Sequence, residues 1–207
     1  GLSEVRSWVH THPDAFHVAY PPRQVNNIYF DTIERSLLQE HIDGIAFRAK
    51  LRFRWYGTSW ITQEGQIEIK KKMGQVGYKI TQPIMGTIDL TQNNWREIIQ
   101  AIKNESKDKI ISLFDTMSPA LINQYQREYY ESADKKVRVT LDYDIHAFAQ
   151  RFGLSPNITF AQPTAKKVVI EVKVAKEHYQ SLANALAAFP LRCLQNSKYL
   201  NAMEYTV

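Results

Sequence analysis

Residues 48–54 read RAKLRFR, with a cation at every even position and an apolar residue at every odd position. Successive side chains of a β-strand point to opposite faces. As a helix, the same residues would spread the cations over more than half of the circumference and leave no apolar seam. The alternation therefore predicts a strand with one basic and one apolar face. Taken alone, it is equally typical of an exposed antiparallel strand whose polar face is solvated.

The same design recurs further along the chain. Apolar and polar residues alternate at residues 66–72, 137–142 and 168–174, and residues 24–31 and 121–130 are rich in β-branched and aromatic residues. We therefore predict strands in all of these segments, with Ile67 and Ile69 on the opposite face from Glu68 and Lys70.

Helices are predicted where apolar residues recur at helical spacing. These segments are residues 3–9 with Ser3 as the N-cap, 92–104, 108–115 and 177–188. Residues 32–46 suggest a broken helix or loop, and residues 143–165 look irregular.

The amino-acid composition limits the kinds of protein and of binding partner that need to be considered. The 207 residues are 44% hydrophobic and are expected to form a single globular domain over residues 1–207. The net charge of +5 suggests an anionic partner. One cysteine, Cys193, excludes an internal disulfide and a cysteine-based zinc site. No transmembrane run or signal peptide is visible, so we expect a cytoplasmic protein without a membrane segment of its own.

The helices must bury their apolar stripes, so we expect them to cover the apolar face of the sheet. The charged faces would then lie in open water or curl inward around a lumen. A closed antiparallel β-barrel removes exposed edges, and its basic lumen would need an anion, since Glu68, Asp142 and Glu171 offset only part of the positive charge. Stacked phosphates fit this requirement best.

An ordered set of motifs then resembles a known family. The segments are VNNIYFDT (25–32), AKLRFRWYG (49–57), EIKKK (68–72), YQREYY (125–130), VRVTLD (137–142), VVIEVK (168–173) and SKY (197–199). Together they resemble the VTC domain, a polyphosphate polymerase-like branch of the CYTH or triphosphate tunnel metalloenzyme superfamily. The resemblance implies an α+β fold in which an antiparallel tunnel of about eight strands, flanked by helices, binds triphosphate or polyphosphate. It places the first tunnel strand upstream of Gly1.

Site residues follow from the resemblance position by position. It implies a catalytic group made up of Arg52, Arg54, Lys70, Arg127 and Lys198. It implies further substrate contacts from Arg48, Lys50, Glu68, Lys72, Tyr125 and Arg138. Glu171 resembles the family's metal-binding glutamate, and the expected metal is Mn²⁺ or Mg²⁺.

The implied function is transfer of the γ-phosphate of ATP to a growing polyphosphate chain. A hydrolase that cleaves triphosphate and a non-catalytic polyphosphate-binding module remain as alternatives. ATP and polyphosphate are the expected partners; nucleic acid is not, because the aromatic residues Trp55, Trp60 and Trp95 form no evident stacking platform. A membrane or regulatory partner would lie outside this chain.

The period-2 pattern also predicts the side-chain register. The cations Arg52, Arg54, Lys70, Arg127 and Arg138 are expected to share one cavity. The apolar residues Leu51, Phe53, Ile67 and Ile69 are expected to pack under helices. Because like charges repel, the sequence alone suggests that Arg52→Ala would leave the ligand-free protein equally or more stable.

Overall fold

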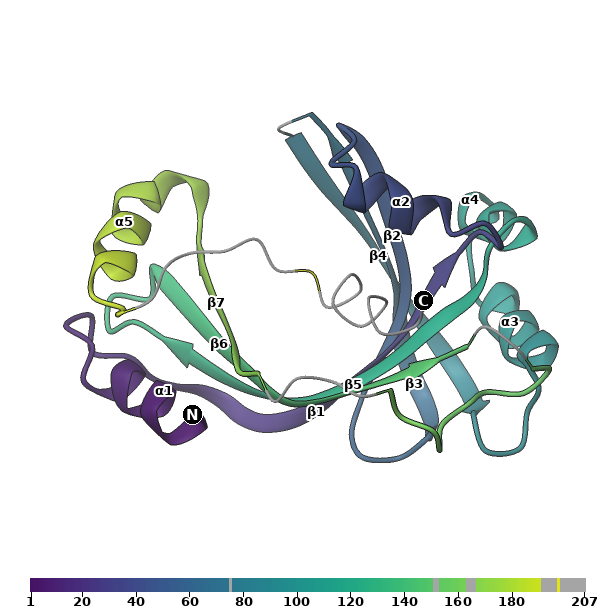
Figure 1. The fold of residues 1–207 in the computed structure, drawn as a ribbon, viewed down its shortest axis with the longest axis horizontal. Coiled ribbons are helices and arrows are strands. Elements are labelled where there is room, and N and C mark those ends of the chain that lie inside the picture. Colours follow the sequence, from purple (N-terminus) through teal and green to yellow (C-terminus); the bar gives the residue numbers. More distant parts are fainter. Residues whose placement is uncertain (75, 151–152, 163–166, 191–196, 198–207) are drawn as a thin grey trace. The chain divides into compact units, whose positions relative to one another are not determined.

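A computed structural model describes residues 1–207 except 75, 151–152, 163–166, 191–196 and 198–207, and no side chain is described at 41, 47, 48, 109 and 176. The elements follow one another along the chain as shown in Figure 1. They are α1 (Leu2–His10), β1 (His17–Asp31), α2 (Ser36–Ile42), β2 (Phe47–Tyr56), β3 (Ile61–Met73), β4 (Val76–Asp89), α3 (Trp95–Asn104), α4 (Asp108–Ile111), the 3₁₀ helix η1 (Ser112–Asp115), β5 (Ser118–Glu131), β6 (Val137–Ala149), β7 (Val169–Val174), the 3₁₀ helix η2 (Lys176–His178) and α5 (Tyr179–Ala187).

The strands are hydrogen-bonded in the order β4-β3-β2-β1-β5-β6-β7. The registered pairs are antiparallel, so the predicted α+β class with an antiparallel sheet is confirmed. Seven strands are present in the described residues, where about eight were expected, and this sheet is not closed by pairing between β4 and β7. No helix among the described residues is long and apolar enough to cross a membrane.

The chain divides into two compact units. Unit 1 comprises residues 1–24, 125–145 and 165–195, and unit 2 comprises residues 25–124, 146–164 and 196–207. The strands β1, β5 and β6 each contribute to both units. A single domain over residues 1–207 stays a prediction, and the two units are described separately below.

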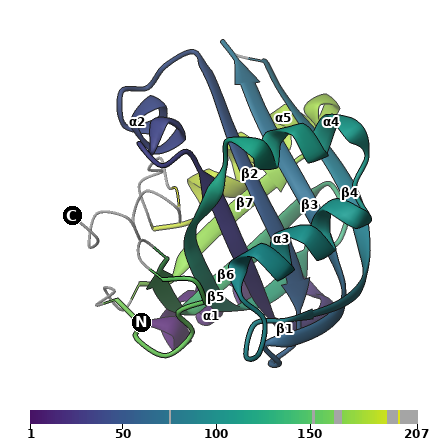
Figure 2. The same cartoon turned by 90° about the vertical axis from the view of Figure 1, so that its right-hand side faces the viewer.

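The core of unit 2 lies on the apolar face of β1, β2 and β3. Leu51 and Phe53 pair with Ile69 and Ile67 on the neighbouring strand, which places all four side chains on one face. They are at most 3% exposed. The apolar stripe of α3 and the side chains Ile110 and Phe114 pack against this face, and Figure 2 shows α3 and α4 lying across the strands. The expectation that these residues pack under helices is confirmed.

The core of unit 1 follows the same rule. Val137, Val139 and Leu141 of β6 are at most 1% exposed and pair with Val174, Val172 and Ile170 of β7. Val5 and Val9 of α1 and Ala185 of α5 complete this cluster, so two amphipathic helices supply the apolar side chains. The intervening positions carry the polar side chains of Arg138, Thr140 and Asp142 on β6 and of Glu171 and Lys173 on β7.

Several boundaries differ from the sequence-based expectations. The strand β4 was not predicted, because Gly77 and Pro83 interrupt its apolar pattern; Pro83 is tolerated because β4 is an edge strand. β6 extends to Ala149 into the segment expected to be irregular, and β1 begins before the pair Pro21-Pro22. The N-cap of α1 is Gly1 and not Ser3.

Gly65 is required by close packing inside unit 2. A Cβ at this position would lie 2.3 Å from Cζ of Phe53 and 2.8 Å from the carbonyl oxygen of Arg54, and neither the buried ring nor the backbone can give way cheaply. We expect Gly65→Ala to lower the free energy of unfolding by about 2 kcal/mol, measured by denaturant titration. Gly77→Ala on β4, whose nearest contact would be 3.5 Å away, is the control, and an equal loss in both variants would contradict the packing argument.

Candidate functional site

The polar face of unit 2 carries a row of cations from adjacent strands. On β2 and β3, Arg52 lies opposite Glu68, Arg54 opposite Gln66 and Lys50 opposite Lys70. Side chains paired directly across an antiparallel ladder point to the same face. Tyr29 and Asn27 of β1 pair with Arg52 and Arg54, so they join this face from the other side. We call it the basic face, defined by Arg52, Arg54, Lys50, Lys70, Lys72 and Lys79.

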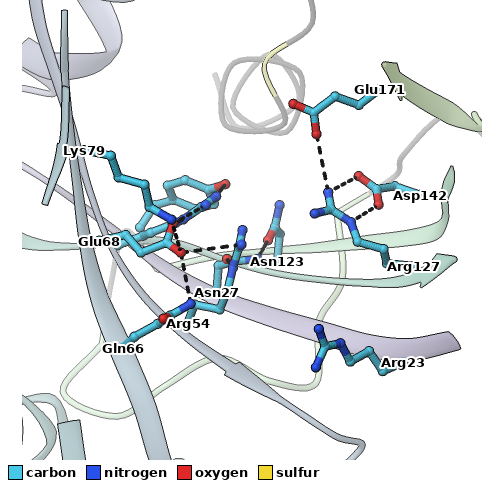
Figure 3. Close-up of polar contacts among 12 residues, drawn as sticks. Arg23, Asn27, Arg54, Gln66, Glu68, Lys79, Asn123, Arg127, Asp142 and Glu171 are labelled. Carbon is cyan, nitrogen blue, oxygen red and sulfur yellow. Dashed lines mark hydrogen bonds and ion pairs between the residues drawn. The ribbon is translucent and has the colours of Figure 1, made fainter. Parts of the chain in front are cut away.

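Glu68 lies at the centre of the basic face and is 3% exposed. Its Oε2 accepts a hydrogen bond from Nε of Arg52 at 2.7 Å and a second from Nη2 of the same guanidinium. Its Oε1 accepts from Nζ of Lys79 at 2.9 Å and from Nε2 of Gln66 at 3.0 Å, and Nη1 of Arg54 lies 3.6 Å away (Figure 3). One carboxylate of β3 therefore holds three cations from the two strands that flank it, β2 and β4.

The electrostatics of this cluster follow from that geometry. Burial disfavours the charged carboxylate, but the positive charges of Arg52 and Arg54 outweigh burial and lower the pKa of Glu68 from 4.5 to about 2. Glu68 is consequently ionised at neutral pH. The ion pairs with Glu68 hold the three cations together without an external anion. Because one negative charge offsets only one of three positive charges, the cluster keeps an excess of two positive charges that attracts anions.

Arg54 is held by a second set of contacts. Its Nε donates to Oδ1 of Asn27 at 2.8 Å, and Nδ2 of Asn27 donates to Oδ1 of Asn123 at 2.8 Å. Both asparagines are fully buried, and the Arg54 side chain is 9% exposed. The two buried asparagines therefore fix the position of the Arg54 guanidinium.

The remaining predicted residues of this face differ in their surroundings. Nζ of Lys50 donates to Oγ of Ser197 at 2.8 Å. Lys70 is exposed and Lys72 is half-buried. The side chain of Arg48 and the whole of Lys198 lie outside the described residues, so their predicted roles stay predictions.

Unit 1 contains a second charged cluster. Nη2 of Arg127 donates to Oδ2 of Asp142 at 2.7 Å, and Nε of Arg127 donates to Oδ1, which makes the ion pair bidentate. Asp142 is fully buried. Glu171 lies further out: its Oε2 is 3.9 Å from Nη2 of Arg127 and 3.1 Å from Nζ of Lys173 (Figure 3).

The aromatic residue Tyr125 supports this cluster. Its ring is 1% exposed, and Cζ of Arg127 lies 5.3 Å from the ring centroid. Burial disfavours the charged guanidinium, but the hydrogen bond to Asp142 outweighs burial and raises the pKa of Arg127. Arg127 is thus permanently charged on a rigid support. Arg138 lies on the same face of β6 as Asp142, opposite Lys173 of β7, and its side chain is exposed.

The sequence profile of the VTC domain matches residues 4–207. This chain belongs to the VTC domain family. A search of curated proteins gave no significant match. Among solved structures, the PH1819 protein from Pyrococcus horikoshii OT3 aligns with a TM-score of 0.53 at 17% identity, covering 99% of this chain and 94% of that one. A Bacillus halodurans protein named as a candidate adenylate cyclase aligns with a TM-score of 0.50 at 13% identity, covering 95% and 87%. At these identities the likeness shows the fold.

Within the described residues, one carboxylate is a candidate ligand for a metal ion. Among the described residues, no group of three His, Cys, Asp or Glu side chains is placed to hold one. Asp142 and Glu68 are buried and held by arginines, whereas Glu171, which also lies near Arg127 and Lys173, has a side chain that is 42% exposed. Mg²⁺ is commonly bound by one or two carboxylates together with phosphate oxygens and water. An exposed carboxylate such as Glu171 is compatible with that mode.

Sequence reasoning missed three residues of the VTC domain site. Lys79 lies on the unpredicted strand β4, although the alternation Tyr78-Lys79-Ile80-Thr81 was a usable signal. Asn27 and Asn123 carry no charge, and nothing in a single sequence shows that they meet. Of the predicted residues, the structure brings together Arg52, Arg54 and Glu68 in unit 2, and Tyr125, Arg127 and Glu171 in unit 1.

The Arg127–Asp142 pair leads to a stability prediction. We expect Asp142→Asn to lower the free energy of unfolding by about 2 kcal/mol, because Arg127 would stay buried with a neutral partner that offers one acceptor oxygen instead of two. Chemical denaturation at neutral pH measures this. The control is Asp43→Asn, at an exposed carboxylate that accepts a hydrogen bond from Gln39. If Asp142→Asn matched the control, the pair would contribute nothing to folding.

Proposed function

We propose that this VTC domain binds the phosphate chains of ATP and polyphosphate on its basic face and transfers the γ-phosphate of ATP to the end of a polyphosphate chain. The observation that carries the proposal is the cluster around Glu68 of β3, where two arginines of β2 and a lysine of β4 are held from the two flanking strands with positive charge in excess. Membership of the VTC domain family supports the phosphate-chain ligand. The candidate catalytic residues remain Arg52, Arg54, Lys70, Arg127 and Lys198.

Phosphoryl transfer requires mainly that the protein position the reacting groups and stabilise their negative charge. Phosphoryl transfer proceeds through a transition state whose negative charge is spread over several oxygens, so positioning and electrostatic stabilisation supply most of the catalysis. A guanidinium fork grips two oxygens of one phosphate, and lysines add point charges along the chain. Arg52 and Arg54 would orient one phosphate group, while Lys50, Lys70 and Lys72 extend the positive charge along the same face.

Rigid supports make this positioning effective. Arg52 is held by Glu68, Arg54 by Asn27 and Arg127 by Asp142, so each guanidinium is oriented before a ligand arrives. A bound Mn²⁺ or Mg²⁺, held by Glu171 and phosphate oxygens, would shield charge on the reacting phosphate. Pre-oriented charges of this kind need no reorganisation during the reaction.

The experiment is incubation of the protein with ATP and Mn²⁺, followed by gel separation of phosphate chains and by assay of released orthophosphate. Chain growth supports the proposed transfer. Orthophosphate release without chain growth favours the triphosphate hydrolase, and tight binding of polyphosphate with neither product favours the binding module. Arg52→Ala is expected to abolish growth. The control is Lys136→Ala, at an exposed lysine that is paired with Asp134 and belongs to neither cluster.

A further inference from the structure

Two buried amides lie beneath the basic face of unit 2. Asn27 of β1 and Asn123 of β5 are both fully buried, and 96 residues of sequence separate them. Nδ2 of Asn27 donates to Oδ1 of Asn123, and Oδ1 of Asn27 accepts from Nε of Arg54, each at 2.8 Å (Figure 3). The two amides and the guanidinium thus form a chain of hydrogen bonds that we call the amide relay.

The amide relay has one allowed direction. The Nε–H of a guanidinium can only donate, so the atom of Asn27 that faces Arg54 must be the oxygen. The other end of the Asn27 amide is then a donor and requires an acceptor, which the oxygen of Asn123 supplies. A reversed Asn27 amide would set its NH₂ group against the Nε–H of Arg54. Asn123 therefore fixes the orientation of Asn27, and Asn27 fixes the orientation of Arg54.

The amide relay and Glu68 together determine the orientation of the Arg54 guanidinium. Its Nε is occupied by Asn27, and Nη1 lies 3.6 Å from Oε1 of Glu68. The plane of the guanidinium is thereby defined from two sides, and its charge is not neutralised by an amide. We propose that Asn27 and Asn123 are positioning residues for phosphate binding that act through Arg54, an inference that rests on the proposed function.

The relay also carries an energetic cost that a purely structural contact would avoid. Nδ2 of Asn123 is buried without a hydrogen-bond partner in the described structure. A buried donor left without a partner is unfavourable, and a pair of apolar side chains would fill the same space without that cost. Two amides at this position are therefore better explained by the orientation of Arg54 than by packing.

A neighbouring contact provides a matched comparison. Nε2 of Gln124 on β5 donates to Oδ1 of Asn26 on β1 at 3.1 Å. This second amide pair joins the same two strands one residue along each strand, and its side chains point to the opposite face. Loss of either pair removes one side-chain hydrogen bond between β1 and β5, but only the relay reaches Arg54.

The experiment measures the affinity for tripolyphosphate without metal, by calorimetry, in a double-mutant cycle. We expect Asn123→Leu to weaken binding about fivefold and Asn27→Leu about twentyfold, with Gln124→Leu within about twofold of the wild type. In the Arg54→Ala background, Asn123→Leu and Asn27→Leu should change the affinity by no more than about twofold, because their target is gone. Thermal unfolding of every variant is recorded alongside.

Each outcome has a distinct meaning. If Asn27→Leu fails to fold, Asn123→Leu carries the test, together with the ¹⁵N-detected exchange rate of the Arg54 Nε–H, which should rise when the relay is cut. An unchanged affinity in folded Asn123→Leu would overturn the positioning role and leave the proposed function standing. Equal weakening with and without Arg54 would overturn action through Arg54. If the wild type does not bind tripolyphosphate, the proposed function fails, and the positioning role fails with it.

Discussion

Glu171→Gln is expected to reduce metal-dependent turnover by about 100-fold or more, a rise of roughly 3 kcal/mol in the activation free energy. The substitution keeps the shape of the side chain and removes its charge. In the proposed reaction Glu171 would hold the metal ion, which would supply positive charge beside the reacting phosphate. Steady-state ATP turnover at saturating Mn²⁺ measures the effect.

A second measurement separates chemistry from binding in the same variant. Tripolyphosphate affinity without metal should persist in Glu171→Gln, because in the proposed function the cations of the basic face bind the phosphate chain and Glu171 does not. Glu177→Gln is the matched control, since Glu177 is an exposed glutamate in the same unit. Turnover near the wild-type rate would show that Glu171 does not hold the metal. The other carboxylates of the two clusters, Glu68 and Asp142, would then have to be tested in the same way.

The sequence predicted which face of its strand each side chain occupies, because side chains alternate between the two faces of a strand whatever packs against it. The cations Lys50, Arg52 and Arg54 and the isoleucines of residues 66–72 lie on opposite faces of β2 and β3, as the alternation requires. Secondary structure beyond such patterns was less predictable. β4 was missed because Gly77 and Pro83 break the pattern, although an edge strand tolerates both.

Side-chain partners could not be predicted, because they depend on which strands become neighbours. The contact of Asn27 with Asn123 requires β1 to lie beside β5, and no local pattern specifies that. The partner of Arg52 shows the consequence. From the sequence, Arg52→Ala was expected to relieve repulsion, but Arg52 donates two hydrogen bonds to the buried Glu68, and losing this ion pair reverses the expected sign. We now expect a less stable ligand-free protein.

Glu68→Gln is expected to have two large effects of opposite sign. Metal-free tripolyphosphate should bind about tenfold more tightly, because Arg52, Arg54 and Lys79 would present three positive charges without an internal carboxylate. The ligand-free protein should be less stable, because the same cations would repel each other. If Glu68 instead contacts the substrate directly, as the family resemblance implied, the affinity would fall. Glu64→Gln, at an exposed glutamate of the same strand, is the matched control.

The pH dependence gives the stability effect of Glu68 a specific signature. Its pKa is lowered from 4.5 to about 2 in the folded protein, so the ionised carboxylate stabilises the fold fully above pH 4.5, and this contribution is lost as the pH falls towards 2. A shift of this size corresponds to roughly 3 kcal/mol, which we reduce to about 2 kcal/mol because Arg52 and Lys79 are partly exposed to solvent. Wild type and Glu68→Gln should therefore differ by about 2 kcal/mol in the free energy of unfolding at pH 7 and converge near pH 2. Denaturant titrations across this range measure the difference directly, and other carboxylates cancel because both proteins share them. A difference that stayed constant with pH would mean that Glu68 stabilises the fold through packing and not through its charge.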